Sequence, residues 1–82
     1  MGFESGIREE VLNRLRRVEC QVRGIQRLIE QGAHCRKVAS QVKAARTALD
    51  AAGKLVLACY LADSIAAADM SEREAIEMII KF

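Results

Sequence analysis

The chain has 82 residues, 51% of them hydrophobic, with three Cys, one Tyr, two Phe, neither Trp nor Pro, and a net charge of +2. This length and this supply of Leu, Ile, Val and Ala predict a single helical domain over residues 1–82. A lone chain of this size cannot bury that much apolar surface, so we expect a homo-oligomer. Cysteines without a signal peptide indicate a reducing cytoplasm, and no apolar run approaches the ~18 residues of a membrane span, so no membrane partner is expected.

A first helix is predicted over about residues 7–31. Its apolar residues are spaced by fours and threes, as in a heptad repeat. They are Ile7, Val11, Leu15, Val18, Val22, Ile25 and Ile29. Gly32 then supplies the glycine that commonly follows the last residue of a helix.

A second, longer helix is predicted over about residues 34–69, or roughly 50 Å at 1.5 Å per residue. Its main apolar stripe consists of Cys35, Val38, Val42, Ala45, Leu49, Ala52, Val56 and Cys59. A second stripe of mostly small residues consists of Ala44, Ala48, Leu55, Ala58, Ala62 and Ile65. We interpret this second stripe as a dimerisation face on which two copies pair antiparallel.

A short third helix is predicted to begin at Ser71. Ser71-x-x-Glu74 is a capping box, and Ile76, Ile79 and Ile80 follow it as apolar positions. The predicted fold is therefore an all-α, three-helix protomer with a long second helix.

Positive charge is concentrated in the first two thirds of the chain. Residues 1–54 carry 11 Lys or Arg against 6 Asp or Glu, whereas residues 55–82 carry 2 against 5. On the first helix one face holds Arg8, Leu12, Arg16, Cys20, Arg23 and Arg27, while Arg14 and Arg17 flank the apolar stripe. The second helix adds Arg36, Lys37, Lys43 and Arg46. Because arginine forks match phosphate oxygens, this pattern predicts binding to the backbone of double-stranded DNA. The alternative is a helical adaptor module whose basic face is only solvated.

The cysteines suggest a chemical sensor. Cys35 is expected in the first turn of the second helix, beside His34, Arg36 and Lys37, where positive charge and the helix dipole favour the thiolate. Cys59 lies 24 residues later, roughly 36 Å along a straight helix, so the two thiols can meet only between antiparallel subunits.

Other chemistry-bearing residues are few. Tyr60 and Ser64 lie one turn apart just beyond Cys59, and His34 is a candidate partner for Cys35. We assign Cys20 no site role. The sequence has neither a CxxC nor an HxxxH motif, nor a Gly-rich phosphate loop, so no enzymatic activity is expected.

These residues resemble one family. LNRLRRVECQVRGIQRLIEQG at residues 12–32 resembles the first-helix signature of the copper-, nickel/cobalt- and formaldehyde-sensing repressors (CsoR/RcnR/FrmR), with Cys20 where glycine is usual. HCRKVASQVKAARTALDAAG at residues 34–53 resembles their second helix. The resemblance implies a disc-like tetramer, a dimer of antiparallel dimers, that binds operator DNA until an effector is sensed. Arg14 matches a DNA-contact position, and Arg16, Arg17 and Lys43 fall within the implied DNA-binding surface.

The resemblance implies a sensor role for Cys35, but the other residues of the family's sensing site are not matched in this chain. Where the copper-sensing pattern has His and Cys, this chain has Tyr60 and Ser64, and Met78 stands where an acidic residue is expected. A persulfide-sensing branch uses two thiols across the dimer, and Cys35 with Cys59 is a displaced version of that arrangement.

Three effectors therefore stay open. We rank a thiol-reactive species first, followed by Cu(I) held between Cys35 and Cys59 and by formaldehyde bridging Cys35 to an amine such as that of Gly2. Zn(II) and Ni(II) are disfavoured because too few nitrogen and sulfur donors converge. No cofactor is certain.

Overall fold

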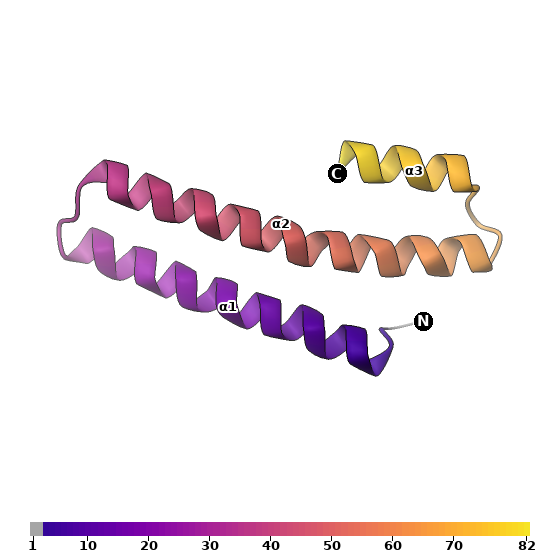
Figure 1. Cartoon of the computed structure of the whole chain (residues 1–82), viewed down its shortest axis with the longest axis horizontal. Helices are drawn as coiled ribbons and strands as arrows, with labels where there is room; N and C mark the ends of the chain where they lie inside the picture. Colours follow the sequence, from indigo (N-terminus) through magenta and orange to yellow (C-terminus); the bar gives the residue numbers. More distant parts are fainter. Residues whose placement is uncertain (1–2) are drawn as a thin grey trace.

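The computed structural model describes residues 3–82 and contains, within them, three α-helices: α1 (Ser5–Glu30), α2 (Cys35–Ala66) and α3 (Glu72–Lys81). α1 and α2 form an antiparallel hairpin, and α3 folds back along the second half of α2 (Figure 1). The molecule is an elongated slab of 52 × 27 × 12 Å. The all-α prediction is confirmed, and each predicted helix end lies within three residues of the observed one.

The contact between α1 and α2 follows a heptad repeat. Val11 and Val18 of α1 are buried, as are Ala45 and Ala52 of α2. In each helix these buried residues are seven apart, which is the spacing that keeps one row facing a neighbouring helix. The small alanines allow the two backbones to approach closely, and this interface is the main core of the protomer.

Only half of the predicted α1 stripe lies in this core. Leu15, Val22 and Ile29 are exposed, whereas the residues that precede them, Arg14, Gln21 and Leu28, are half-buried. α1 therefore carries two adjacent apolar rows, and the protomer buries only one.

Each of the two stripes predicted on α2 is buried only in part. Ala48 and Leu55, which we assigned to the dimerisation face, are half-buried, and Leu55 lines a pocket with Ile7 of α1. Val42, Leu49 and Val56, which we assigned to the core, are 48%, 50% and 41% exposed. Leu15, Leu49 and Val56 line one groove of about 420 Å³. We call the rows Leu15, Val22, Ile29 and Val42, Leu49, Val56 the exposed apolar face.

α3 begins as predicted. Ser71 is its N-cap, and its hydroxyl accepts a hydrogen bond of 3.2 Å from the Glu74 N–H. Ala75 of α3 and Leu61 and Ser64 of α2 are buried. Ile76, Ile79 and Ile80 remain exposed, so α3 covers one end of α2 without burying its own apolar side.

The two interhelical turns use the same hydrogen-bonding pattern with different residues in the left-handed position. After α1 that position is Gly32 with φ 75°, and after α2 it is Ala68 with φ 61°. In both turns the next N–H returns to a carbonyl in the last helical turn, from Ala33 to Leu28 at 2.9 Å and from Asp69 to Ser64 at 2.9 Å. A Cβ atom makes the left-handed conformation unfavourable, so Ala68 is strained where Gly32 is not.

We therefore expect Ala68→Gly to raise the free energy of unfolding by about 0.5–1 kcal/mol, the relief of strain exceeding the added entropy of the unfolded chain. Gly32→Ala is the opposite substitution in the matching turn, and it should lower the free energy of unfolding by about 1 kcal/mol. Urea denaturation at one fixed protein concentration measures both changes. A destabilised Ala68→Gly protein would show that the turn is held by contacts other than those of its backbone.

Candidate effector site and nucleic-acid interface

Cys35 is the first residue of α2, and its thiol is exposed. The preceding residue, His34, caps the helix: its Nδ1 accepts a hydrogen bond of 3.1 Å from the Arg36 N–H. Arg36 and Lys37 are exposed in the same turn, which contains no acidic residue. The predicted position of Cys35 in the first turn of α2, beside His34, Arg36 and Lys37, is therefore confirmed.

The capping bond also defines what His34 can do. Because Nδ1 accepts a hydrogen bond, the proton of the neutral ring is on Nε2, which is left to face outward as a donor. We predicted His34 as a partner of Cys35 and not as the N-cap of α2, because Ser, Thr, Asp and Asn are the usual N-cap residues.

Cys35 and Tyr60 lie on the same face of α2. An α-helix turns by about 100° per residue, so Tyr60 and Ser64 project within about 20° of the direction of Cys35. Cys59 projects about 120° away from it. Consistently, Tyr60 is exposed, whereas Cys59 is half-buried toward α1 in the row of Ala45 and Ala52.

A cavity of about 480 Å³ lies at the far end of α2 from Cys35. It brings together three predicted site residues, Cys59, Tyr60 and Ser64, and two carboxylates that the sequence analysis missed, Asp63 and Asp69. Phe3, Val56 and Ala67 complete its lining. The spacing of Asp63, one turn beyond Cys59 on the same helix, was the signal that could have identified it.

One protomer does not contain the whole predicted site. Cys35 begins α2, and Tyr60 lies 25 residues further along the same helix, roughly 37 Å away. Only a second copy, antiparallel to the first, can place a thiol from Cys35 beside this cavity. The Gly2 amine, considered above for formaldehyde, lies outside the described residues, but Phe3 shows that the segment leading to α1 reaches the cavity.

Among residues 3–82, no three His, Cys, Asp or Glu side chains lie close enough to hold an ion. The face that Cys35 shares with Tyr60 and Ser64 provides one sulfur and two hydroxyl oxygens. Cu(I) prefers soft sulfur donors, so this face alone does not suit it. Met78, at the position where a carboxylate was expected, is on the exposed surface of α3.

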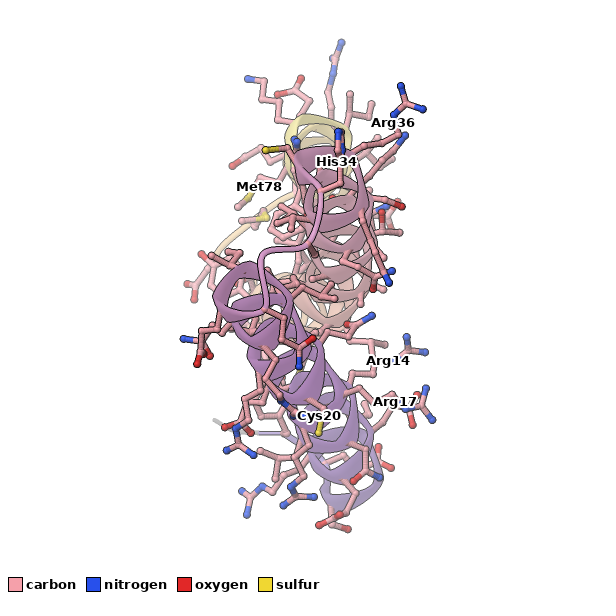
Figure 2. All side chains as sticks on the ribbon, turned by 90° about the vertical axis from the view of Figure 1, so that its left-hand side faces the viewer. Arg14, Arg17, Cys20, His34, Arg36 and Met78 are labelled. Atoms are coloured by element: carbon pink, nitrogen blue, oxygen red, sulfur yellow. The ribbon has the colours of Figure 1, made fainter. Side chains whose placement is uncertain are left out.

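The predicted DNA-binding arginines divide between two sides of α1. Arg14 and Arg17 extend to the same side of the slab, as does Arg36 of α2, and Met78 lies on the other side (Figure 2). Arg16 is two residues from Arg14, or about 200° around the helix, and its guanidinium donates a 3.0 Å hydrogen bond to Asn13. Lys43 is exposed on α2. The three arginines therefore do not form one patch on a single protomer.

Arg14 is held within the protomer. Its Nε donates to Oε1 of Glu10 at 3.0 Å, in an ion pair one helical turn apart. Both side chains remain about half exposed, so the pair is weak and a phosphate could displace it. Arg17 forms no ion pair within the described part of the chain. Cys20 is exposed on α1, and nothing near it suggests a site (Figure 2).

Comparison with known proteins gives two findings. The family model described as metal-sensitive transcriptional repressor matches residues 7–82. The crystal structure of the copper-sensing repressor CsoR with Cu(I) from Geobacillus thermodenitrificans NG80-2 is similar over 99% of this chain and 86% of that chain, with 25% identity and a TM-score of 0.73. No curated protein matches the sequence. Along residues 3–82, no helix combines the length and apolar character needed to cross a membrane.

Proposed function

Because the chain belongs to the family of metal-sensitive transcriptional repressors, we propose that it binds operator DNA as a homotetramer and releases it when an effector acts at Cys35. The family consists of transcriptional repressors rather than enzymes. The observation that carries the proposal is the exposed Cys35 thiol at the cationic start of α2, on the same face as Tyr60. We place the protein in the cytoplasm, where such a thiol stays reduced.

The exposed apolar face supports the assembly. It runs along both α1 and α2, and a second copy packed antiparallel on it would bury rows that water otherwise contacts. The same pairing brings Cys35 of one subunit to the cavity at Tyr60 of the other. Two such dimers would make the disc-like tetramer and bring together four copies of the arginines that we propose for DNA, Arg14, Arg16 and Arg17, with Lys43.

A thiol-reactive effector is the candidate that the site supports best. The Cys35 thiolate attacks the outer sulfur of a persulfide, RS–SH, which gives Cys35–S–SH and releases RS⁻. The partner's Cys59 thiolate then attacks the inner sulfur, forming the Cys35–Cys59 disulfide and releasing HS⁻. The second step requires Cys59 to reach out from its half-buried position, so the pairing would shift α1 against α2 and deform the DNA-binding surface.

Two other effectors have a specific observation in their favour. Cu(I) is supported by the similarity to a copper-sensing repressor solved with that ion, and would need both Cys35 and the partner's Cys59 as ligands. Formaldehyde is supported by the position of Phe3 at the cavity. The competing class, a helical adaptor module without DNA, is distinguished by the first experiment below.

Reduced, effector-free protein is expected to shift a duplex from its own upstream region at moderate salt, in preference to a shuffled duplex, with affinity that falls steeply as salt rises. Light scattering on the same reduced protein without DNA should give the mass of a tetramer, four times 9.1 kDa. Equal binding to both duplexes, or none, would favour the adaptor. A monomer mass at micromolar concentration would refute the proposed site that two subunits share.

A further inference from the structure

The ring of Phe82, which follows α3, lies directly on Gly53 of α2. A Cβ atom placed on Gly53 would be 2.8 Å from Cζ and 3.2 Å from Cε1 of this ring. Carbon atoms do not approach that closely, so the ring occupies the space of the missing side chain. Glycine inside a long helix costs about 1 kcal/mol relative to alanine. Here the cost accompanies a specific contact between α3 and α2.

The same ring borders the candidate effector site. Phe82 and Tyr60 line one groove with Leu15, Leu49 and Val56. Gly53 and Tyr60 are seven residues apart and therefore on one face of α2. A helical side chain leans toward the N-terminus of its helix, so Tyr60 leans toward the turn of Val56, which also lines this groove.

Tyr60 stands between two spaces. It lines the groove together with Phe82, and it lines the 480 Å³ cavity with Cys59 and Ser64. An occupant of the cavity that moved Tyr60 would therefore change the groove that Tyr60 shares with Phe82, and α3, which leads to Phe82, is the element that we expect to respond. α3 joins α2 through the strained Ala68, and most of its apolar side chains are exposed.

We propose that Phe82, seated on Gly53, is a positioning residue of the effector site: it braces Tyr60 and links effector binding to the position of α3. This inference rests on the proposed function for its effector-dependent part only. The bracing itself concerns the effector-free protein and can be measured without DNA.

The chain supplies its own reporter, because Tyr60 is the only tyrosine and there is no tryptophan. Tyrosine emission and its quenching by acrylamide therefore report on this residue alone. Phe82→Ala removes the ring. Gly53→Ala displaces the ring while raising the helix propensity of α2, so it does not act by unfolding the protein. Ile80→Ala is the matched control, an apolar truncation on the same helix at a side chain that is 77% exposed and does not line the groove.

Both Gly53→Ala and Phe82→Ala are expected to change Tyr60 emission and quenching in the same direction, and Ile80→Ala to leave them as they are. The double variant should match Phe82→Ala alone, because Gly53→Ala has no ring left to displace. In operator-release titrations with a persulfide donor, both single variants should shift the effective concentration by about fivefold or more.

Tyr60 signals that are unchanged in Phe82→Ala, or additive effects in the double variant, would overturn the inference. If the Tyr60 signals change but no effector releases DNA from any variant, the bracing stands and the proposed function fails. If the signals change and the release curves of the variants coincide with that of the parent protein, the link from Tyr60 to α3 is refuted.

Discussion

Replacing Cys35 by Ala is expected to leave operator affinity unchanged and to abolish release by a persulfide donor. Cys35 lies at the exposed start of α2, contributes nothing to the buried core, and is the one thiol with a cationic helix terminus around it. Removing its sulfur removes the nucleophile of the first step, and no other described thiol shares that setting. Fluorescence anisotropy of a labelled operator, with and without the donor, measures both quantities.

Two matched variants separate the roles of the other thiols. Cys20→Ala removes an equally exposed sulfur from the other helix and should respond as the parent protein does. Cys59→Ala should allow Cys35 to be modified but weaken or prevent release. A Cys35→Ala protein that still releases DNA would exclude Cys35 as the sensor. A Cys59→Ala protein with a normal response would retain Cys35 and refute the two-thiol model.

Replacing Arg14 by Ala is expected to weaken operator binding by roughly tenfold to a hundredfold, the worth of one or two charge-assisted hydrogen bonds to phosphate. The loss should be similar for the operator and for unrelated duplexes, and the slope of log affinity against log salt should become shallower by about one for each phosphate contact removed. In the proposed tetramer this arginine would be present four times, so we expect a larger effect than in a monomer.

The ion pair with Glu10 provides a sharper control. Glu10→Gln removes the negative charge that pairs with the Arg14 guanidinium at 3.0 Å, and it should strengthen DNA binding. Glu9→Gln makes the same change of charge one residue earlier, at an exposed side chain without an ion pair among the described residues, and should strengthen it less. Equal effects of the two variants would mean that only net charge matters. No effect of Arg14→Ala would remove this residue from the interface.

The sequence predicted the elements of this fold better than their packing. Spacing, the glycine after α1 and the capping box at Ser71 specify where helices run, because these signals are local. Which apolar row faces which neighbour is not local. Leu15 and Val18 are both apolar and lie on adjacent rows of α1, and only the geometry of the hairpin buries Val18 and leaves Leu15 exposed. The second helix shows the same limit, since Val42 and Ala45 belong to one predicted stripe, yet Ala45 is buried and Val42 is exposed.

The candidate site was predictable in part for the same reason. The setting of Cys35 follows from its neighbours in sequence and was confirmed. The capping role of His34 depends on one side-chain rotamer, and the cavity at Tyr60 depends on Phe3 and Asp69, which come from opposite ends of the chain. The pairing of Cys35 with the partner's Cys59 stays a prediction. Around the axis of α2, Tyr60 projects closer to the direction of Cys35 than Cys59 does.

The measurement that tests the central claim most directly is one titration with two readouts. Reduced protein bound to its operator is treated with increasing persulfide donor, and each sample is divided between anisotropy and intact-mass analysis with peptide mapping. Sulfur added at Cys35, or a Cys35–Cys59 cross-link, should rise in proportion to the DNA released. Release without a change in mass, or modified Cys35 with the operator still bound, would contradict the account.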